Sequence, residues 1–363
     1  ISTSGMPMMK RAEVLGAISR TMPTIAVAGT HGKTTVSSMI AHILKEAGVS
    51  FTAFIGGIAN NFGSNLVLNP SSEWLVVEAD EYDRSFLHLH PQISVVTSMD
   101  PDHLDIYGSR DAMEDTYRSF AAKTKHEGKL IHRLGLPLEA TKTDTLTFAL
   151  ENEADFSAHD IRVENDCFEF SMQTPDGIYT THIGVPGHHN VLNALAAAAT
   201  CYAAGVEPLA SAEALPSYKG VWRRFDIIVR RPNFIYIDDY AHHPEELRAA
   251  ITTARNLRPG KHLTGIFQPH LYSRTRDFMD GFAKSLALLD RLILLDIYPA
   301  RELPIDGISS AKLLEKVALK DKMLLSMDEA IDFVKTHPTD VLMTLGAGDI
   351  DRMVAPLKTM FEG

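Results

Sequence analysis

The sequence predicts an α/β protein built from two domains, and three observations lead to that prediction. The chain has 363 residues, which is more than one ordinary domain holds. Apolar runs typical of buried strands alternate with stretches of helical periodicity, first near the N-terminus and again from about residue 217. Between residues 129 and 183 the pattern changes to short alternating strands. We therefore expect a first domain whose sheet has a mixed or antiparallel edge, followed by a second, doubly wound domain.

The first domain begins with a strand, a glycine turn and a helix. Thr24–Gly29 is a short apolar run, and Lys33–Ala47 has the apolar spacing of a helix. Two further apolar runs, Trp74–Asp80 and Ile93–Asp100, break into acidic residues. Ligands of open parallel sheets bind at the carboxyl ends of strands, so we expect these acids at a functional edge. His188–Gly205 predicts a helix of small residues that packs closely on the sheet.

The second domain is predicted from five strands that alternate with helices. The strand candidates are Phe234–Tyr240, Leu263–Phe267, Arg291–Tyr298, Lys322–Ser326 and Asp340–Gly348. The helix candidates are Pro244–Asn256, Asp277–Leu289, Ser310–Leu319, Met327–Thr336 and Ile350–Met360. A boundary between the domains is expected near Pro216–Gly220, where Pro, Ser, Tyr and Gly interrupt both patterns.

Composition excludes several classes of protein. The 35 basic and 46 acidic residues give a net charge of −11, which argues against a general surface for nucleic acid or anionic membrane. Cys167 and Cys201 show neither metal-site spacing nor a disulfide framework, as expected in a reducing compartment. No apolar run is long enough to span a membrane, and the first residues carry no signal-peptide pattern. We expect a cytoplasmic protein with no nucleic-acid or membrane partner.

The stretch VAGTHGKTT, Val27–Thr35, resembles a phosphate-binding loop without its first glycine. The usual motif is G-x-x-x-x-G-K-[ST], and Val27 stands where its opening glycine is expected. The position between a strand and a helix is correct for phosphate binding, because a helix N-terminus offers free N–H groups. Lys33 can reach the outer phosphates, and the hydroxyl of Thr34 can join a magnesium ion.

Eight blocks in the same order make the sequence similar to the Mur ligases, the ATP-dependent, amide-forming enzymes of peptidoglycan synthesis. The blocks are Gly29–Thr35, Glu78–Phe86, Asp100–Gly108, Gly187–Ala199, Gly220–Asp226, Asp238–Leu247, Phe267–Phe278 and Gly346–Ile350. Within the family, D-D-Y-x-H-H-P and F-Q-P-H followed by S-R-T-R are most similar to the members that join L-alanine to UDP-N-acetylmuramate. The implied reaction forms ADP through an acyl phosphate, with ATP and Mg²⁺ as cofactors and these small molecules as partners.

The resemblance also implies a domain plan. Residues 21–216 would form a central, P-loop ATPase-like domain that binds ATP, and residues 217–363 a Rossmann-like C-terminal domain that contacts the amino acid and ATP. Residues 1–20 resemble the linker after a UDP-binding N-terminal domain. Such a domain would bind the uridine nucleotide part of the substrate, and binding energy from a remote part of a substrate helps to drive chemistry at the reacting centre. We therefore expect residues 1–363 alone to bind Mg-ATP but to form little ligated product.

The resemblance implies a role for each matching site residue. The catalytic residues would be Lys33, His242 and Arg274. The ATP-binding residues would be Gly29, Thr30, His31, Gly32, Lys33, Thr34, Thr35, His189, Asn190, Asn193, Arg224 and Asp239. The substrate-binding residues would be Tyr240, His242, Arg274 and Arg276. The magnesium ligands would be Thr34, Glu78 and His103. Asp80, Glu81 and Asp83 could instead form a solvated acidic turn, so they rank as supporting residues only.

Some of these assignments have alternatives. Histidine is an unusual ligand for a hard cation, so His103 alone suggests a structural role. Asn190 could instead cap a helix. Leu271 stands where the alanine-adding members often carry a second arginine, for which Arg276 could compensate. Residues 117–119 offer no lysine for the modified-lysine metal ligand of several relatives. A murein-peptide ligase and, outside the family, a nucleotide-binding hydrolase or regulator remain alternative functions.

Overall fold

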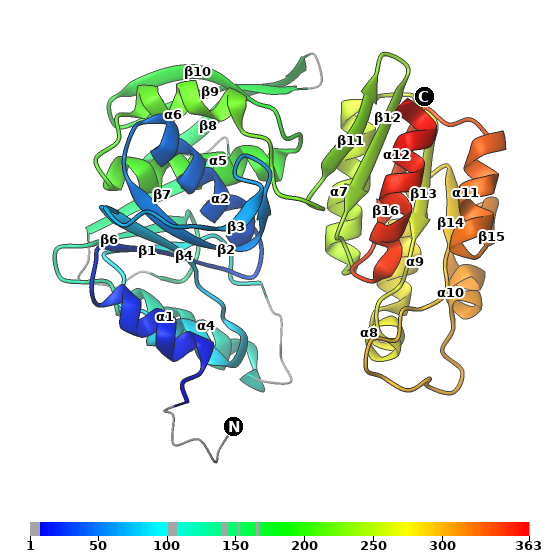
Figure 1. The fold of residues 1–363 in the computed structure, drawn as a ribbon, viewed down its shortest axis with the longest axis horizontal. Helices are drawn as coiled ribbons and strands as arrows, with labels where there is room; N and C mark the ends of the chain where they lie inside the picture. The colour runs from blue at the N-terminus through cyan, green and yellow to red at the C-terminus, as the bar shows by residue number, and fades with distance from the viewer. Residues whose placement is uncertain (1–7, 101–106, 139–143, 151–152, 165–166, 363) are drawn as a thin grey trace. The chain divides into compact units, whose positions relative to one another are not determined.

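The chain folds into two compact units, Ile1–Val221 and Trp222–Gly363, in a computed structural model (Figure 1). The structure describes residues 8–100, 107–138, 144–150, 153–164 and 167–362. The division falls a few residues after the predicted boundary at 216. Residues 217–221 stay with the first unit because Asn61 binds the backbone of Ser217 and Lys219, at 2.9 and 2.7 Å. Val221 also forms an antiparallel bridge with Ala59.

The described residues of the first unit form a ten-stranded sheet of order β10-β9-β8-β7-β6-β5-β1-β4-β2-β3. The strands are β1 (Thr24–Ala28), β2 (Phe51–Ala59), β3 (Ser64–Val67), β4 (Trp74–Glu78), β5 (Ile93–Val96), β6 (Lys129–Arg133), β7 (Asp144–Leu150), β8 (Phe156–Glu164), β9 (Cys167–Thr174) and β10 (Gly177–Ile183). Seven neighbouring strands of the sheet pair in parallel, in the order β8-β7-β6-β5-β1-β4-β2. Strand β3 pairs antiparallel with β2, β9 with β8, and β10 with β9. The predicted mixed sheet is confirmed, with antiparallel strands at both edges.

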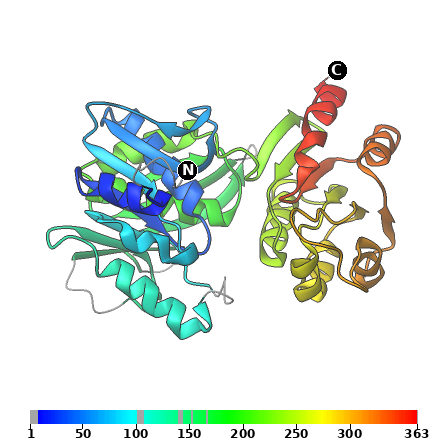
Figure 2. The same ribbon diagram turned by 60° about the horizontal axis from the view of Figure 1, so that its bottom comes forward.

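Helices cover both faces of this sheet (Figure 1 and Figure 2). They are α1 (Arg11–Ser19), α2 (Lys33–Glu46), α4 (Arg110–Ala121), α5 (His188–Ala203) and α6 (Pro208–Ala214), with the 3₁₀ turns η1 (Tyr82–His88) and η2 (Leu215–Ser217). Helices α2 and α5 bury one apolar cluster, and α1 and α4 bury another on the opposite face. Burial on both faces explains why β1, β4 and β5 are almost entirely apolar.

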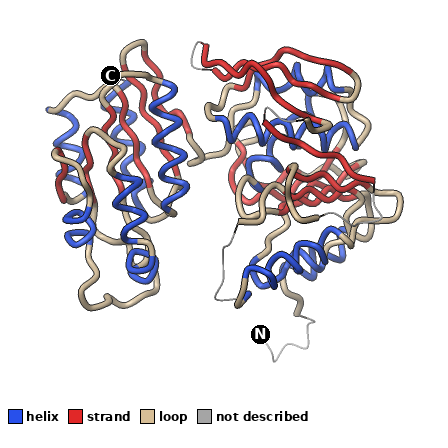
Figure 3. The backbone as a smooth tube through the Cα atoms, turned by 180° about the vertical axis from the view of Figure 1, so that it is seen from behind, coloured by secondary structure: helices blue, strands red, loops and turns tan. Residues whose placement is uncertain are grey.

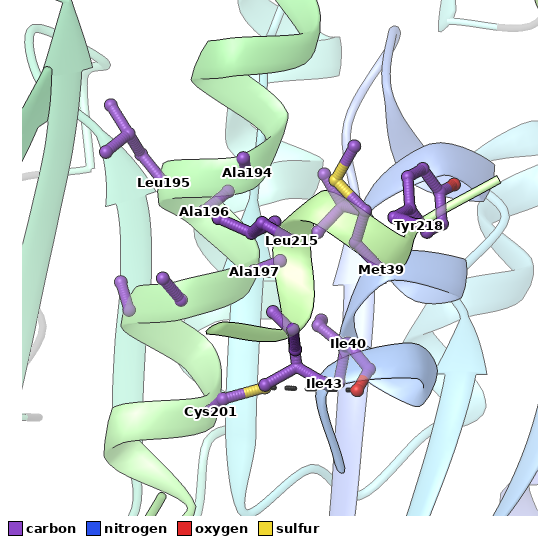
Figure 4. Close-up of a cluster of buried hydrophobic side chains, with 14 of the residues drawn as sticks. Met39, Ile40, Ile43, Ala194, Leu195, Ala196, Ala197, Cys201, Leu215 and Tyr218 are labelled. Carbon is purple, nitrogen blue, oxygen red and sulfur yellow. Dashed lines mark hydrogen bonds between the residues drawn. The ribbon is translucent and has the colours of Figure 1, made fainter. Parts of the chain in front are cut away.

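The alanine-rich stretch of α5 packs closely against α2 (Figure 4). All residues from Ala194 to Ala199 are fully buried. Figure 4 shows Ala196 and Ala197 on the side of α5 that faces Met39 and Ile40 of α2, with Leu215 between the two helices. Small side chains let the two helix backbones approach, so the predicted small-residue helix is confirmed. This contact places the first turn of α5 beside the first turn of α2.

The described residues of the second unit form a six-stranded sheet of order β11-β12-β16-β13-β14-β15. Its strands are β11 (Asp226–Arg231), β12 (Phe234–Asp239), β13 (Leu263–Phe267), β14 (Arg291–Leu294), β15 (Asp321–Leu324) and β16 (Val341–Leu345). The five predicted strands are confirmed, and they pair in parallel. Strand β11 was not predicted; it is an antiparallel edge strand with a register shift and exposed arginines.

Helices also cover both faces of the second sheet, as Figure 3 shows from behind. They are α7 (Pro244–Leu257), α8 (Tyr272–Asp277), α9 (Met279–Leu286), α10 (Ser310–Lys316), α11 (Met327–Thr336) and α12 (Val354–Glu362), with the 3₁₀ turn η3 (Asp349–Met353). Helices α7, α9 and α10 bury one apolar cluster, and α11 and α12 bury the other. Among the described residues, every helix is too short or too polar to cross a membrane.

Candidate active site

The loop between β1 and α2 is pressed between two neighbouring elements. Gly29 has φ of 139°, and a Cβ there would lie 2.0 Å from Thr97 Oγ1. Gly32 has φ of 84°, and a Cβ there would lie 2.7 Å from Asn193 Oδ1 of α5. Both the left-handed backbone and the lack of space require glycine at these two positions. The close approach fixes the loop against the end of β5 on one side and α5 on the other.

Hydrogen bonds to the segment after β5 hold the loop in one conformation. The backbone N–H of His31 donates to Ser98 Oγ at 2.8 Å, and Thr97 Oγ1 donates to the His31 carbonyl at 2.5 Å. The Thr30 hydroxyl donates to the Asp100 carbonyl at 2.8 Å. Thr97 and Ser98 were not predicted as site residues, although they follow a buried strand at the expected edge. The loop therefore presents a fixed backbone to a ligand.

Lys33, at the first position of α2, lies in an ion pair with Glu81. Its Nζ is 2.8 Å from the Gly29 carbonyl oxygen and 2.8 Å from both Glu81 carboxylate oxygens. The two side chains are only 15% and 5% exposed. The sequence suggested only a supporting role for Glu81, because nothing in its spacing indicates a contact with a residue 48 positions away.

Thr34 and Glu78 meet at two consecutive glycines of β2. Glu78 Oε2 accepts a hydrogen bond from the Gly56 N–H at 2.8 Å. A Cβ at Gly57 would lie 3.3 Å from Thr34 Cγ2. A hydroxyl and a carboxylate are the hard oxygen ligands that Mg²⁺ prefers. His103 lies outside the described residues, and in the described part of the chain no three His, Cys, Asp or Glu side chains gather as a metal site.

The start of α5 places two amides beside the loop. Asn190 Nδ2 donates to the Pro186 carbonyl at 2.8 Å, and Asn193 Nδ2 donates to Asn190 Oδ1 at 3.3 Å. The cap of α5 is Gly187, so the alternative that Asn190 caps this helix is wrong. Asn193 lies against Gly32, whereas His189 is exposed. The predicted adenine-binding segment and the phosphate loop are thus neighbours within one unit.

In the second unit, Asp239 organises the turn after β12. Its two carboxylate oxygens accept the N–H groups of Phe225 and Ala241 at 2.6 and 2.7 Å. Burial raises the pKa of Asp239 to about 7, against the lowering effect of Arg224 and of these hydrogen bonds. The Arg224 guanidinium lies 5.3 Å from the centre of the Tyr240 ring. In this structure Asp239 shapes the backbone that presents Arg224 and Tyr240.

Arg223, which was not predicted, anchors the same turn. Its Nε lies 3.1 Å from Asp238 Oδ2, and one terminal nitrogen donates to the Gly346 carbonyl at 2.6 Å. Both members of this ion pair are buried. Gln268 completes the junction, because its side chain binds Asp349 and the Ile350 N–H at 2.9 and 3.0 Å. The loops after β12, β13 and β16 are therefore locked together at the carboxyl edge of the sheet.

Two histidines lie close together at this edge. The rings of His242 and His270 have centroids 6.2 Å apart, and His242 packs edge-on to Tyr240 at 5.2 Å. Burial lowers the pKa of His242; Glu246 opposes this effect and Arg274 adds to it. Burial, with His242 and Arg274, lowers the pKa of His270 to about 4. Both imidazoles are therefore neutral near pH 7. His270 was not among the predicted site residues, although its F-Q-P-H block was.

The predicted arginines of α8 have different surroundings. The charge of Arg274 acts on both imidazoles. Arg276 instead pairs with its neighbour Asp277 at 2.7 Å, with both side chains 52% exposed. Leu271 has an unusual φ of 70°, and its N–H donates to the Tyr298 carbonyl at 2.9 Å. The pairing with Asp277 gives no support to the expectation that Arg276 compensates for Leu271.

Known proteins share both domains of this chain. Residues 27–201 match the Mur ligase middle domain, and residues 223–348 match the Mur ligase, glutamate ligase domain. The chain is 50% identical over 350 residues to the UDP-N-acetylmuramate–L-alanine ligase of Flavobacterium psychrophilum, covering 96% of this chain and 77% of that protein.

Solved structures agree with these matches. The crystal structure of the UDP-N-acetylmuramate-alanine ligase of Thermotoga maritima superposes with a TM-score of 0.81 at 26% identity, over 96% of this chain and 78% of that one. A murein peptide ligase of Psychrobacter arcticus, 23% identical, shares the fold with a TM-score of 0.69 over 98% of this chain and 81% of its own. Because both domains match in order and the sequence relationship covers nearly the whole chain, this protein belongs to the Mur ligase family.

Proposed function

We propose that this protein is an ATP-dependent ligase that joins L-alanine to UDP-N-acetylmuramate with formation of ADP and phosphate. The observation that carries the proposal is the 50% identity, over 96% of the chain, with a ligase of that name. The loop of the first unit supplies the nucleotide chemistry that such a reaction needs. The carboxyl edge of the second sheet supplies groups suited to an amino acid.

The reaction has two steps. The carboxylate of UDP-N-acetylmuramate attacks the γ-phosphorus of ATP, and ADP leaves. The amine of L-alanine then attacks the acyl carbon, inorganic phosphate leaves, and the amine loses a proton. Phosphoryl transfer depends mostly on positioning and charge neutralisation. Lys33 and the free N–H groups at the start of α2 provide both, because they converge where the loop meets the helix.

Mg²⁺ fits the oxygen ligands of the first unit. Glu78, whose Oε2 accepts from the Gly56 N–H, and the hydroxyl of Thr34 would hold it, since both side chains carry hard oxygen atoms. When bound, the ion would supply positive charge that offsets the charge of the phosphate oxygens. Asn190 and Asn193 would bind the adenine edge, because an amide offers both a donor and an acceptor.

In the second unit, Arg274 would bind the alanine carboxylate, because a guanidinium can form two parallel hydrogen bonds with it. His242 would contact the amino group. Its Nδ1 lies 2.9 Å from the Tyr240 carbonyl and 3.3 Å from Glu246 Oε2, so this nitrogen carries the proton. The neutral ring therefore has its acceptor at Nε2. That nitrogen can take the proton that the amine loses.

The alternatives have weaker support. The murein peptide ligase neighbour is 23% identical, a level at which the likeness concerns the fold alone. A nucleotide hydrolase or regulator would need only the loop of the first unit. Such a function does not explain why the loops of the second unit are joined by hydrogen bonds or why His242 and His270 lie side by side.

The test measures ADP release by the full-length protein with ATP, Mg²⁺ and a panel of amino acids, with and without UDP-N-acetylmuramate. We expect rapid ADP release only when both L-alanine and UDP-N-acetylmuramate are present. ADP release without an amino acid would identify a hydrolase. Preference for a preformed peptide over L-alanine would identify a peptide ligase.

A further inference from the structure

The ammonium of Lys33 is bound on two sides by the protein itself. Gly29 and Glu81 both lie 2.8 Å from Nζ, and the Glu81 residue is only 4% exposed. An ammonium has three N–H groups, so these acceptors leave one for a phosphate oxygen. A buried carboxylate beside the cation of a phosphate-binding loop opposes the binding of an anion. The position of Glu81 beside Lys33 therefore indicates a role other than binding of the phosphate.

The backbone around Glu81 is held in an uncommon conformation. Asp83 and Arg84 both have φ of 53°, in the left-handed region that residues with a Cβ seldom adopt. The Tyr107 hydroxyl donates to the Glu81 carbonyl at 2.5 Å, and the Arg84 guanidinium lies 5.5 Å from the Tyr107 ring centre. Strain of this kind persists where the surroundings fix a residue for a purpose. Here the strained residues follow Glu81, which contacts Lys33, by two and three positions, while Glu81 itself has ordinary helical angles, φ −74° and ψ −21°.

We propose that Glu81 is a positioning residue for Lys33. It fixes the ammonium across the loop so that the remaining N–H faces the transferring phosphoryl group, and it offsets part of the positive charge there. A donor that is already oriented stabilises developing charge without a cost of reorganisation. The same carboxylate weakens the binding of ADP, which favours release of this product. The inference rests on the proposed function, because it assigns Lys33 to phosphoryl transfer.

Two substitutions separate the charge of Glu81 from its contact. Glu81→Gln keeps an acceptor of the same length but removes the negative charge. We expect ADP to bind about three- to tenfold more tightly, since an opposing charge near the phosphates is gone, while kcat falls. Glu81→Asp keeps the charge but is one methylene too short to keep the contact. We expect its kcat to fall without tighter binding of ADP.

Two further variants serve as controls. Glu127→Gln makes the same change in charge at an exposed residue before β6, at the amino edge of the sheet. Its kcat and ADP affinity should equal those of the unchanged protein. Tyr107→Phe removes the hydroxyl that fixes the Glu81 backbone but leaves the carboxylate. It should lower kcat with little change in ADP affinity, and it tests the proposal if Glu81→Gln does not fold.

The measurements are ADP binding by calorimetry, ligation kinetics and the thermal midpoint of each variant of the full-length protein. Tighter ADP binding with a lower kcat in Glu81→Gln, and a lower kcat in Tyr107→Phe, would support the proposal. If Glu81→Gln binds ADP more weakly and has a lower thermal midpoint, Glu81 has only a structural role and the proposal is overturned. Unchanged ADP affinity and unchanged kcat in this variant would also overturn the proposal. If the full-length protein without substitutions binds ADP but makes no ligated product, that result would count against the proposed function and not against the role of Glu81.

Discussion

At the scale of single residues, Gly32 of the proposed phosphate loop can be compared with Gly48, a glycine outside that loop. Gly32 and Gly48 stand at the two ends of α2, and both have positive φ, 84° and 73°. A Cβ at Gly32 would strike Asn193, whereas a Cβ at Gly48 has no described atom within 4 Å. Substitutions at the two positions therefore separate the effect of backbone strain from the effect of displacing the proposed adenine-binding segment.

We expect Gly32→Ala to lower kcat/KM for ATP far more than Gly48→Ala. Both changes carry the left-handed penalty of roughly 1–2 kcal/mol, so the thermal midpoint should fall in both variants, and by at least as much in Gly32→Ala as in Gly48→Ala. Only Gly32→Ala forces Asn193 and the loop apart. ATP kinetics and thermal unfolding of both variants provide the measurement. An equal fall in kcat/KM for ATP in Gly32→Ala and Gly48→Ala would show that the contact between Gly32 and Asn193 has no functional role.

Arg274 is the residue of α8 that we assign to the alanine carboxylate. In Arg274→Lys the charge remains, but the two parallel hydrogen bonds of the guanidinium are lost. We expect KM for L-alanine to rise on the order of tenfold, because charge-assisted bidentate pairs are roughly twice as strong as neutral hydrogen bonds. KM for ATP should stay nearly constant. Arg276→Lys is the matched control, since Arg276 pairs with Asp277; a shift in the ATP constant alone would move Arg274 to the nucleotide site.

Several residues of the candidate site could not be predicted from the sequence, for a physical reason. Lys33 and the loop glycines stand at fixed spacing within one strand–turn–helix unit, so local pattern predicts them. The contacts of Glu81, Arg223 and His270 are with residues far away in the sequence. Glu81 lies 48 positions from Lys33, Arg223 lies 15 positions from Asp238, and His270 lies 28 positions from His242. No periodicity connects such partners. Only the pairing of strands brings them together.

At the scale of elements, the contact between α2 and α5 joins the phosphate loop to the predicted adenine-binding segment. Ala197 is fully buried in that contact, as Figure 4 shows. We expect Ala197→Leu to lower the free energy of unfolding by about 1–3 kcal/mol, since overpacking forces neighbours from their rotamers. It should also weaken ADP binding by displacing Asn193. Ala17→Leu, at an exposed position of α1, is the control and should change neither quantity.

Strands buried on both faces were predicted well, whereas β2, β3 and β11, which lie at or next to a sheet edge, were not predicted. Strands β1, β4, β5 and β13 are continuous apolar runs, whose burial in a parallel sheet the sequence alone indicates. Strand β11 and the hairpin of β2 and β3 mix apolar, polar and glycine residues, because one side or one end is exposed. Helix α8 has six residues, which is too short for a periodic signal.

At the scale of the whole molecule, buried histidines of both units connect stability to pH. Burial lowers the pKa of His42 in the first unit and of His242 and His270 in the second. A histidine whose pKa is lower in the folded state than its usual 6.5 binds fewer protons there than in the unfolded chain. Its contribution to stability is complete above pH 6.5 and is lost as the pH falls toward the folded pKa, about 4 for His270.

Asp239 acts in the opposite direction. Its pKa is raised from 3.8 to about 7, so its contribution to stability is present below pH 3.8 and is lost as the pH rises toward 7. Between pH 5 and 6.5, these three histidines and His90, whose pKa burial also lowers, oppose Asp239 and the buried Asp238, whose pKa burial likewise raises. Each group contributes at most about 1.4 kcal/mol per pH unit. We therefore expect the free energy of unfolding to rise with pH across this window.

Urea denaturation at constant ionic strength, at several values between pH 5 and 7, measures that rise. His270→Gln and His42→Gln should each make it shallower, because each removes one titrating group while Asp239 remains. His42→Gln will also be less stable at every pH, since His42 Nε2 lies 3.0 Å from the Ala214 carbonyl and 2.9 Å from Ser217 Oγ. The slope with pH, not the absolute stability, is therefore the quantity to compare. A slope that neither substitution changes would show that these imidazoles titrate alike in the folded and unfolded chain, and the lowering of their pKa by burial would have to be abandoned.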